Sequence, residues 1–175
     1  TGACLVNVVV CWAGMQGYIA ACLRALNQVP GVRMHVFHLN FNDLPFQEEL
    51  LNGVANERLL ASAANADIGD KVVALKPDLV FLCGWFYPPY RALAYDERLK
   101  DAHFVLGMDT PWTGSWQQRV NQWRLKRFMG RMERVVVAGT RSAEFARPGV
   151  GWPSREDWSG VRSSASMVTS LLPTD

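Results

Sequence analysis

The segment from Val6 to Leu26 constrains the fold more than any other part of the sequence. It begins with Val6–Cys11, an apolar run rich in β-branched residues, and continues through Gly14 and Gly17. A short apolar run that ends at glycine predicts a buried strand and a turn. Apolar residues then recur at the i, i+3, i+4, i+7 spacing of one helix face, at Ile19, Cys22, Leu23 and Leu26. Strand, glycine turn and helix in this order predict the first half of a βαβ unit.

The glycine turn has two interpretations. Backbone N–H groups at a helix N-terminus favour anions, so Gly14, Met15, Gln16 and Gly17 form a candidate ligand-binding loop. The spacing Gly14-x-x-Gly17 matches neither the dinucleotide fingerprint G-x-G-x-x-G nor a phosphate loop that ends in Gly-Lys-Ser/Thr. The alternative is that both glycines only permit a tight turn and close packing of helix on strand.

Composition and charge restrict the class of protein. A chain of 175 residues with 49% apolar and 19% charged residues is typical of one folded domain. The net charge of +2 gives no reason to expect a nucleic-acid partner. No apolar run is long enough to cross a membrane, and no signal-peptide pattern is present, so we expect a cytoplasmic location.

Cysteine and histidine spacing gives no reason to expect a metal. The four cysteines contain no C-x-x-C pair, and we expect buried free thiols in a reducing compartment; they are Cys4, Cys11, Cys22 and Cys83. His35 and His38 are three residues apart on a predicted strand and therefore point to opposite faces. We predict no metal site.

Strands and helices alternate along the rest of the chain. Further strands are predicted at 32–39, 78–84, 103–108 and 134–139, and further helices at 46–64, 67–76, 90–100, 117–132 and from 140. This order predicts an α/β fold, a Rossmann-like, mostly parallel sheet with helices on both faces. Ligands of such sheets bind at the carboxyl ends of the strands, near the switch point. The loops at those ends are 12–17, 84–90, 109–116 and 139–142, and they concentrate glycine, tryptophan and polar residues.

Two patterns occupy the predicted helix 117–132. The first is an apolar spacing that we expect to face the core, at Trp116, Val120 and Trp123. The second is a basic stripe at Arg124, Arg127 and Arg131. The stripe is either a solvated helix face or a contact with anionic lipid head groups or phosphates at the inner face of a membrane.

The character of the sequence changes after Arg147. Pro148–Arg155 is rich in helix-breaking residues, and 156–175 is rich in serine without clear periodicity. We therefore expect a domain over 1–147 and an irregular, disordered tail over 148–175.

Several segments together resemble the N-terminal half of GT-B glycosyltransferases of the family 4 type. They are Cys11–Tyr18, Lys76–Val80, Gly84–Trp85, Met108–Trp112 and Val137–Thr140. The resemblance implies one half of a GT-B fold, the acceptor-side domain of an enzyme with two Rossmann-like domains. It also implies a nucleotide-sugar donor, a sugar or lipid-linked acceptor, and metal-independent catalysis without a further cofactor.

The resemblance suggests roles for individual residues. Gly14, Met15, Gln16 and Gly17 match the loop that borders donor phosphates and acceptor. Substrate contacts are expected from the other matching positions, which are Trp85, Tyr87, Thr110, Trp112, Thr140 and Arg141. Asp109 follows the predicted strand 103–108, where its carboxylate could act on an acceptor hydroxyl. The alternatives are that Asp109 caps the turn through Pro111 and that Thr140 is a helix N-cap.

The chain departs from the family pattern after Arg147. The paired-glutamate motif E-x7-E of the donor-binding domain does not occur there, and Pro148 interrupts the helix. We therefore expect a truncated or frameshifted glycosyltransferase that is inactive alone, because half a cleft cannot orient two substrates. The alternatives are a stand-alone Rossmann-like module for a nucleotide or small ligand, and an interaction protein that uses its aromatic loops and basic stripe.

Overall fold

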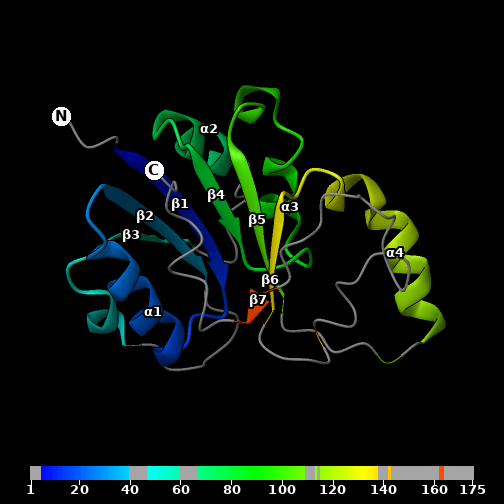
Figure 1. Ribbon diagram of the computed structural model, residues 1–175, viewed down its shortest axis with the longest axis horizontal. Helices are drawn as coiled ribbons and strands as arrows, with labels where there is room; N and C mark the ends of the chain where they lie inside the picture. The colour runs from blue at the N-terminus through cyan, green and yellow to red at the C-terminus, as the bar shows by residue number, and fades with distance from the viewer. Residues whose placement is uncertain are drawn as a thin grey trace. The chain divides into compact units, whose positions relative to one another are not determined.

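The computed structural model describes residues 5–39, 47–59, 67–108, 113, 115–137, 142 and 162–163. The chain forms two compact units, Thr1–His103 and Phe104–Asp175. Figure 1 shows the helices and strands in the order of the chain.

The described residues of the first unit form four parallel strands in the order β3-β2-β1-β4. The strands are β1 (Val6–Ala13), β2 (Val32–Leu39), β3 (Ala55–Arg58) and β4 (Leu79–Leu82). The helical segments are α1 (Gly17–Asn27), α2 (Ile68–Ala74), α3 (Pro88–Leu93) and the 3-10 turns η1 (Glu48–Leu51) and η3 (Glu97–Leu99). The order places the switch point of the sheet between β1 and β4.

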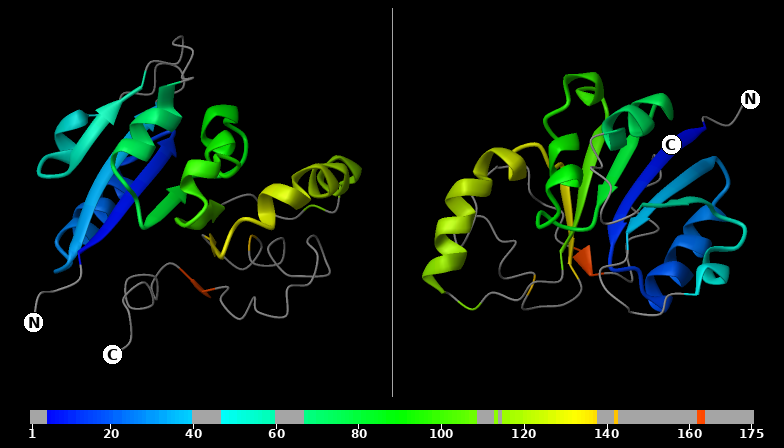
Figure 2. Two further views of the ribbon diagram at one scale, coloured as in Figure 1. Left: turned by 90° about the horizontal axis from the view of Figure 1, so that it is seen from above. Right: turned by 180° about the vertical axis from the view of Figure 1, so that it is seen from behind.

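Helices cover both faces of this sheet. β2 and β3 extend it on one side of β1, and the chain then returns to add β4 on the other side. Right-handed crossovers in opposite directions put their helices on opposite faces. Accordingly, α1 packs with η1 and α2 packs with α3, and Figure 2 shows α1 and α2 on opposite sides of the strands. The predicted Rossmann-like α/β fold is confirmed.

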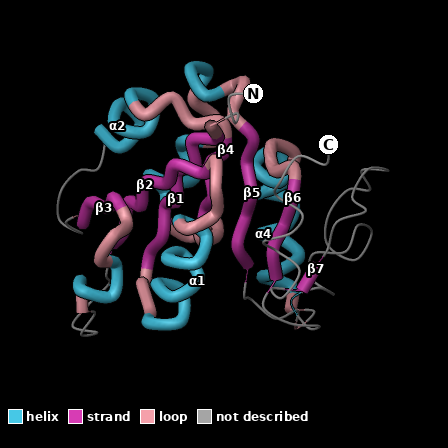
Figure 3. Tube along the Cα trace, turned by 60° about the vertical axis from the view of Figure 1, so that its left-hand side comes forward, coloured by secondary structure: helices cyan, strands magenta, loops and turns pink. Residues whose placement is uncertain are grey.

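Where the second unit is described, it forms three parallel strands in the order β5-β6-β7. They are β5 (His103–Met108), β6 (Arg134–Val137) and β7 (Arg162–Ser163). Helix α4 (Trp116–Met129) connects β5 to β6, as Figure 3 shows. Its N-cap is Ser115, whose hydroxyl accepts a hydrogen bond from the Gln118 N–H.

The central strands are buried, as their unbroken apolar runs predict. The first unit buries Val9, Val10, Cys11 and Val36 almost completely, together with Phe37, Leu39, Val80 and Leu82. In the second unit, Phe104 and Leu106 of β5 pack in a core that also holds Leu125, Phe128 and Met132. The predicted strands at 6–11, 32–39, 78–84, 103–108 and 134–139 are confirmed as β1, β2, β4, β5 and β6, with small differences at their ends.

The predicted helix 46–64 is wrong. In the described part of this range, residues 47–59, the only helical segment is the short turn η1, and Gly53 follows it with a φ of +85°. It then forms β3, which pairs with β2. Helix propensity is weak enough for this pairing to override it.

The predicted helix 90–100 is also wrong in its bounds. α3 begins earlier, at Pro88, because proline suits the first turn of a helix. α3 ends at Leu93, and η3 follows it, with the Asp96 carboxylate as its cap.

Three expectations about side chains are corrected. Cys22 is exposed, because α1 buries Ala20 and Leu23 instead. α4 buries Leu125, Phe128 and Met129. The residues that we expected to face the core are exposed instead; they are Trp116, Val120 and Trp123. The predicted basic stripe is interrupted, because α4 ends at Met129 and the Arg131 guanidinium lies over the Phe104 ring, 4.7 Å from its centroid.

Candidate functional site

Two loops lie side by side at the switch point of the first unit. β1 and β4 are neighbouring parallel strands, so residues 14–18 and 83–87 leave the sheet at adjacent strand ends; we call these residues the strand-end edge. The Cys83 N–H donates to the Cys11 carbonyl at 3.1 Å, and the Ala13 N–H donates to the Cys83 Sγ at 3.0 Å. These bonds hold the start of the loop after β4 against the end of β1, at the edge where a Rossmann-like sheet binds its ligand.

The turn after β1 needs glycine at one position. Gly14 has a φ of +76°, and its N–H donates to the Leu39 carbonyl at 2.7 Å. A Cβ at Gly14 would meet nothing within 4 Å, so the backbone conformation, not crowding, demands glycine. Gly17 has no positive φ, and a Cβ there would only contact Leu50 Cδ1 at 3.8 Å. The structure therefore explains Gly14 by the turn but gives Gly17 no comparable reason.

The N-terminus of α1 has neither a side-chain cap nor an acidic first turn among the described residues. Gln16 is the N-cap in extended conformation, and its side chain makes no capping hydrogen bond with the described part of the chain. The first helical bond runs from the Ala20 N–H to the Gln16 carbonyl at 3.0 Å, and the first turn contains no acidic residue. Gln16 and Gly17 are exposed, whereas the Met15 side chain is buried. The arrangement can bind an anion through backbone N–H groups, and Met15 serves as a packing anchor.

The loop after β4 presents aromatic rings. Phe86 is exposed, and Trp85 and Tyr87 are half-buried. The Tyr87 ring meets the Tyr90 ring edge-on, with 4.8 Å between centroids. Such a loop offers ring faces to a flat or apolar ligand group.

Tyr90 anchors this aromatic loop to the sheet. Its side chain is fully buried, and its hydroxyl lies 3.2 Å from the Phe37 carbonyl and 3.4 Å from the Trp12 carbonyl, to which it donates. Burial raises the pKa of Tyr90 far above its ordinary value. From the sequence, Tyr90 stands where the aromatic loop meets the predicted helix 90–100 and has no predicted role. Its position three residues after Tyr87 was the available signal.

The titratable groups of the first unit are mostly structural. Burial raises the pKa of the Cys11 thiol and lowers the pKa of His35 and His38. His38 Nε2 lies 3.3 Å from Asn56 Oδ1. Among the described residues, no group of three or more His, Cys, Asp or Glu side chains could hold a metal ion.

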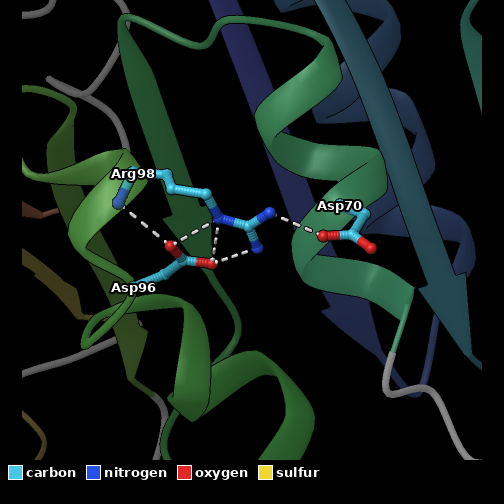
Figure 4. Close-up of polar contacts among 3 residues, drawn as sticks. All are labelled: Asp70, Asp96 and Arg98. Carbon is cyan, nitrogen blue, oxygen red and sulfur yellow. Dashed lines mark hydrogen bonds and ion pairs between the residues drawn. The ribbon is translucent and has the colours of Figure 1, made fainter.

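An ion-pair cluster lies apart from the strand-end edge and joins α2 to η3 (Figure 4). The Arg98 guanidinium contacts the Asp70 carboxylate at 2.6 Å and the Asp96 carboxylate at 2.7 Å. Hydrogen bonds from Arg98 lower the pKa of Asp96. A Cβ on Gly69 would lie 3.3 Å from Arg98 Nη2 and 3.3 Å from Asp96 Oδ2, so this glycine makes room for the cluster. The sequence analysis did not identify it, because its members are close only in the folded chain.

Several predicted site residues lie outside the described residues. They are Asp109, Thr110, Trp112, Thr140 and Arg141. The catalytic role of Asp109 therefore stays a prediction, as does the boundary at 147. The structure does bring Gly14, Gln16 and Gly17 to the same sheet edge as Trp85 and Tyr87.

The fold and the strand-end edge define a Rossmann-like α/β protein, and comparisons with known proteins do not narrow this class. No protein-family model and no curated protein matches the chain. Among solved structures, a nucleoside-diphosphate-sugar epimerase from Agrobacterium tumefaciens is similar, with 13% sequence identity and a TM-score of 0.40. The alignment covers 85% of this chain and 56% of the epimerase chain, and a likeness of this extent does not establish a shared function. No described helix has the length and hydropathy needed to span a membrane.

Proposed function

We propose that the strand-end edge binds a phosphate-bearing ligand with a ring, of the nucleotide or nucleotide-sugar class. The observation that carries the proposal is the juxtaposition of the α1 N-terminus, whose first turn has no acidic residue, with the aromatic loop 85–87 at the switch point. The first offers N–H groups and a positive dipole end to phosphate, and the second offers ring faces to a base or sugar.

We further propose that the chain is the acceptor-side part of a sugar transferase. Support comes from the resemblance of its motifs to GT-B glycosyltransferases, in which the loop of Gly14 and Gly17 borders donor phosphates and acceptor. In this role Asp109 would accept the proton of the acceptor hydroxyl, and Trp85 and Tyr87 would contact the acceptor. The acceptor-side part of a GT-B enzyme forms one half of the cleft, so we expect these residues alone to bind ligand without transferring sugar.

A peripheral membrane contact is the second part of the proposal. Arg124 and Arg127 are exposed on α4, and no acidic residue occurs between Thr110 and Met132. A surface of this charge attracts anionic head groups, which is where a lipid-linked acceptor would lie. Arg131 contributes less, because it is half-buried against Phe104.

Calorimetric titration with UDP, GDP and UDP-glucose tests the ligand proposal. Gln16→Glu adds a negative charge where phosphate would bind, and we expect about three- to tenfold weaker binding because of the lost dipole attraction. The same carboxylate suits a helix N-cap, so the variant should keep its stability. Gln28→Glu adds an equal charge at the other end of α1 and is the matched control.

The aromatic loop is tested separately with the same titrations. Phe86→Ala should weaken binding of the nucleotides, whereas Tyr95→Ala, which truncates an exposed aromatic outside the strand-end edge, should not. Absence of binding by all three compounds would refute the ligand proposal. Equal effects of Gln16→Glu and Gln28→Glu would place the ligand elsewhere, and measurable sugar transfer by the chain would contradict the expected inactivity.

A further inference from the structure

Helix α4 carries an apolar stripe on its exposed side. The exposed fractions are 72% for Trp116, 44% for Val120 and 79% for Trp123. Residues spaced i, i+4 and i+7 share one face of a helix, so these side chains form one row. We call Trp116, Val120 and Trp123 the tryptophan stripe.

The buried side of α4 is already occupied by other residues. Leu125, Phe128 and Met129 are nearly inaccessible to solvent, and they anchor the helix in the core of the second unit. The tryptophan stripe therefore does not stabilise that core. Two tryptophans exposed by more than 70% on one helix are unusual for a surface that meets only water.

Charge identifies the kind of surface that the stripe fits. α4 contains four basic residues and no acidic one, and Arg124, Lys126 and Arg127 are exposed. At about 100° per residue, Arg127 continues the line of the stripe, while Arg124 and Lys126 flank it on either side. Tryptophan prefers the boundary between head groups and acyl chains, and arginine and lysine reach anionic head groups from the same depth.

We infer that α4 is an interfacial helix whose tryptophan stripe inserts into the head-group boundary of an anionic membrane. A helix of 14 residues is about 21 Å long, shorter than the hydrocarbon core of about 30 Å, so it lies along the surface. This inference rests on the membrane part of the proposed function and deepens it. The arginines supply the attraction that was proposed there, and the tryptophans add an apolar anchor that arginines alone do not provide.

Vesicle co-sedimentation with the full chain tests the inference. The vesicles contain phosphatidylcholine alone, or phosphatidylcholine and phosphatidylserine in equal parts. We expect binding to the mixed vesicles and weak binding to the neutral ones. The double variant Trp116→Ser/Trp123→Ser should lower the partition constant by at least about tenfold, and each of Arg124→Gln and Arg127→Gln by about fivefold.

Salt and depth distinguish the two contributions. The arginine variants should reduce the salt dependence of binding, because they remove charge, whereas the double tryptophan variant should keep it. Quenching of tryptophan fluorescence by brominated lipids should fall in the double variant, because the inserted rings are gone. Tyr95→Ser and Arg33→Gln are matched controls, since both residues are exposed and lie outside α4. Circular dichroism should be unchanged in all variants, because every replaced side chain is exposed.

Three outcomes would overturn the inference. Binding to mixed vesicles that is unaffected by the double tryptophan variant would leave the electrostatic contact but exclude the apolar anchor. Absence of binding to mixed vesicles would exclude both, while nucleotide binding at the strand-end edge would be unaffected. If the unmodified chain self-associates and the double tryptophan variant is a monomer, the tryptophan stripe binds a second copy of the chain instead of a membrane.

Discussion

Replacement of Tyr90 by phenylalanine tests the anchor of the strand-end edge. The hydroxyl is buried and donates to the Phe37 and Trp12 carbonyls, and Tyr90→Phe removes it without changing the packing of the ring. A neutral buried hydrogen bond contributes about 1 kcal/mol to the free energy of unfolding. At neutral pH we therefore expect Tyr90→Phe to be less stable by about 1 kcal/mol.

The difference should vanish in alkali. Burial holds the pKa of Tyr90 in the folded chain far above the ordinary value of 10.0, so above this pH only the unfolded chain releases the phenolic proton. The free energy of unfolding of the unmodified chain then falls by about 1.4 kcal/mol per pH unit from this group, and Tyr90→Phe lacks this loss. At a loss of about 1.4 kcal/mol per pH unit, the advantage of about 1 kcal/mol that the hydroxyl gives is used up within about 0.7 pH units. The free energies of unfolding of the two proteins should therefore become equal about 0.7 pH units above 10.

Urea unfolding monitored by circular dichroism between neutral pH and about pH 11 gives this comparison. Cys11 is also buried with a raised pKa and destabilises the chain in alkali, but it does so equally in both proteins and cancels in the difference. A stability difference that is the same at all pH values would show that Tyr90 ionises in the folded chain, and it would refute the buried anchor.

Three further changes give distinct outcomes. Gly14→Ala should lower the free energy of unfolding by about 1–2 kcal/mol because Gly14 has a positive φ, and Gly14→Asn should lower it by less. Gly17→Ala should be neutral or stabilising, and equal losses at both positions in urea unfolding would contradict this. Acidification below about pH 6.5 should destabilise the folded chain, because burial lowers the pKa of His38 and only the unfolded chain takes up the proton. In thermal melts, His38→Gln should weaken the dependence of stability on pH, and an unchanged dependence would refute the assignment to His38. Arg98→Gln should destabilise the chain most at low salt. The loss should shrink as the pH falls below 3.8, the ordinary pKa of an aspartate, because Asp96 then becomes protonated; a pH-independent loss would exclude the ion pair as its cause.

The strands could be predicted because their signal is local. An apolar run rich in β-branched residues, such as Val6–Cys11, has few alternatives to a buried strand, and β1 begins at Val6. β3 could not be predicted in this way, because Ala55–Arg58 is polar and exposed at most positions and becomes a strand by pairing with β2. Its partner lies some twenty residues earlier, and composition does not encode that contact.

The orientation of α4 was predicted incorrectly for a related reason. The sequence offers two apolar faces, one at Trp116, Val120 and Trp123 and one at Leu125, Phe128 and Met129, and periodicity alone does not rank them. The structure buries the second face and leaves the first exposed. A helix with two apolar faces and one core is the pattern that indicates a second contact partner.

The glycines of the first loop show how far sequence and structure together support a ligand. From the sequence, both could serve the turn alone. The structure assigns that purpose to Gly14, whose φ of +76° requires it, while Gly17 has no positive φ and no crowding to explain it. A side chain at Gly17 would stand beside the first N–H groups of α1 and narrow the approach of an anion to them. The proposed ligand site would use the absence of a Cβ at Gly17, because it leaves the first N–H groups of α1 accessible to an anion.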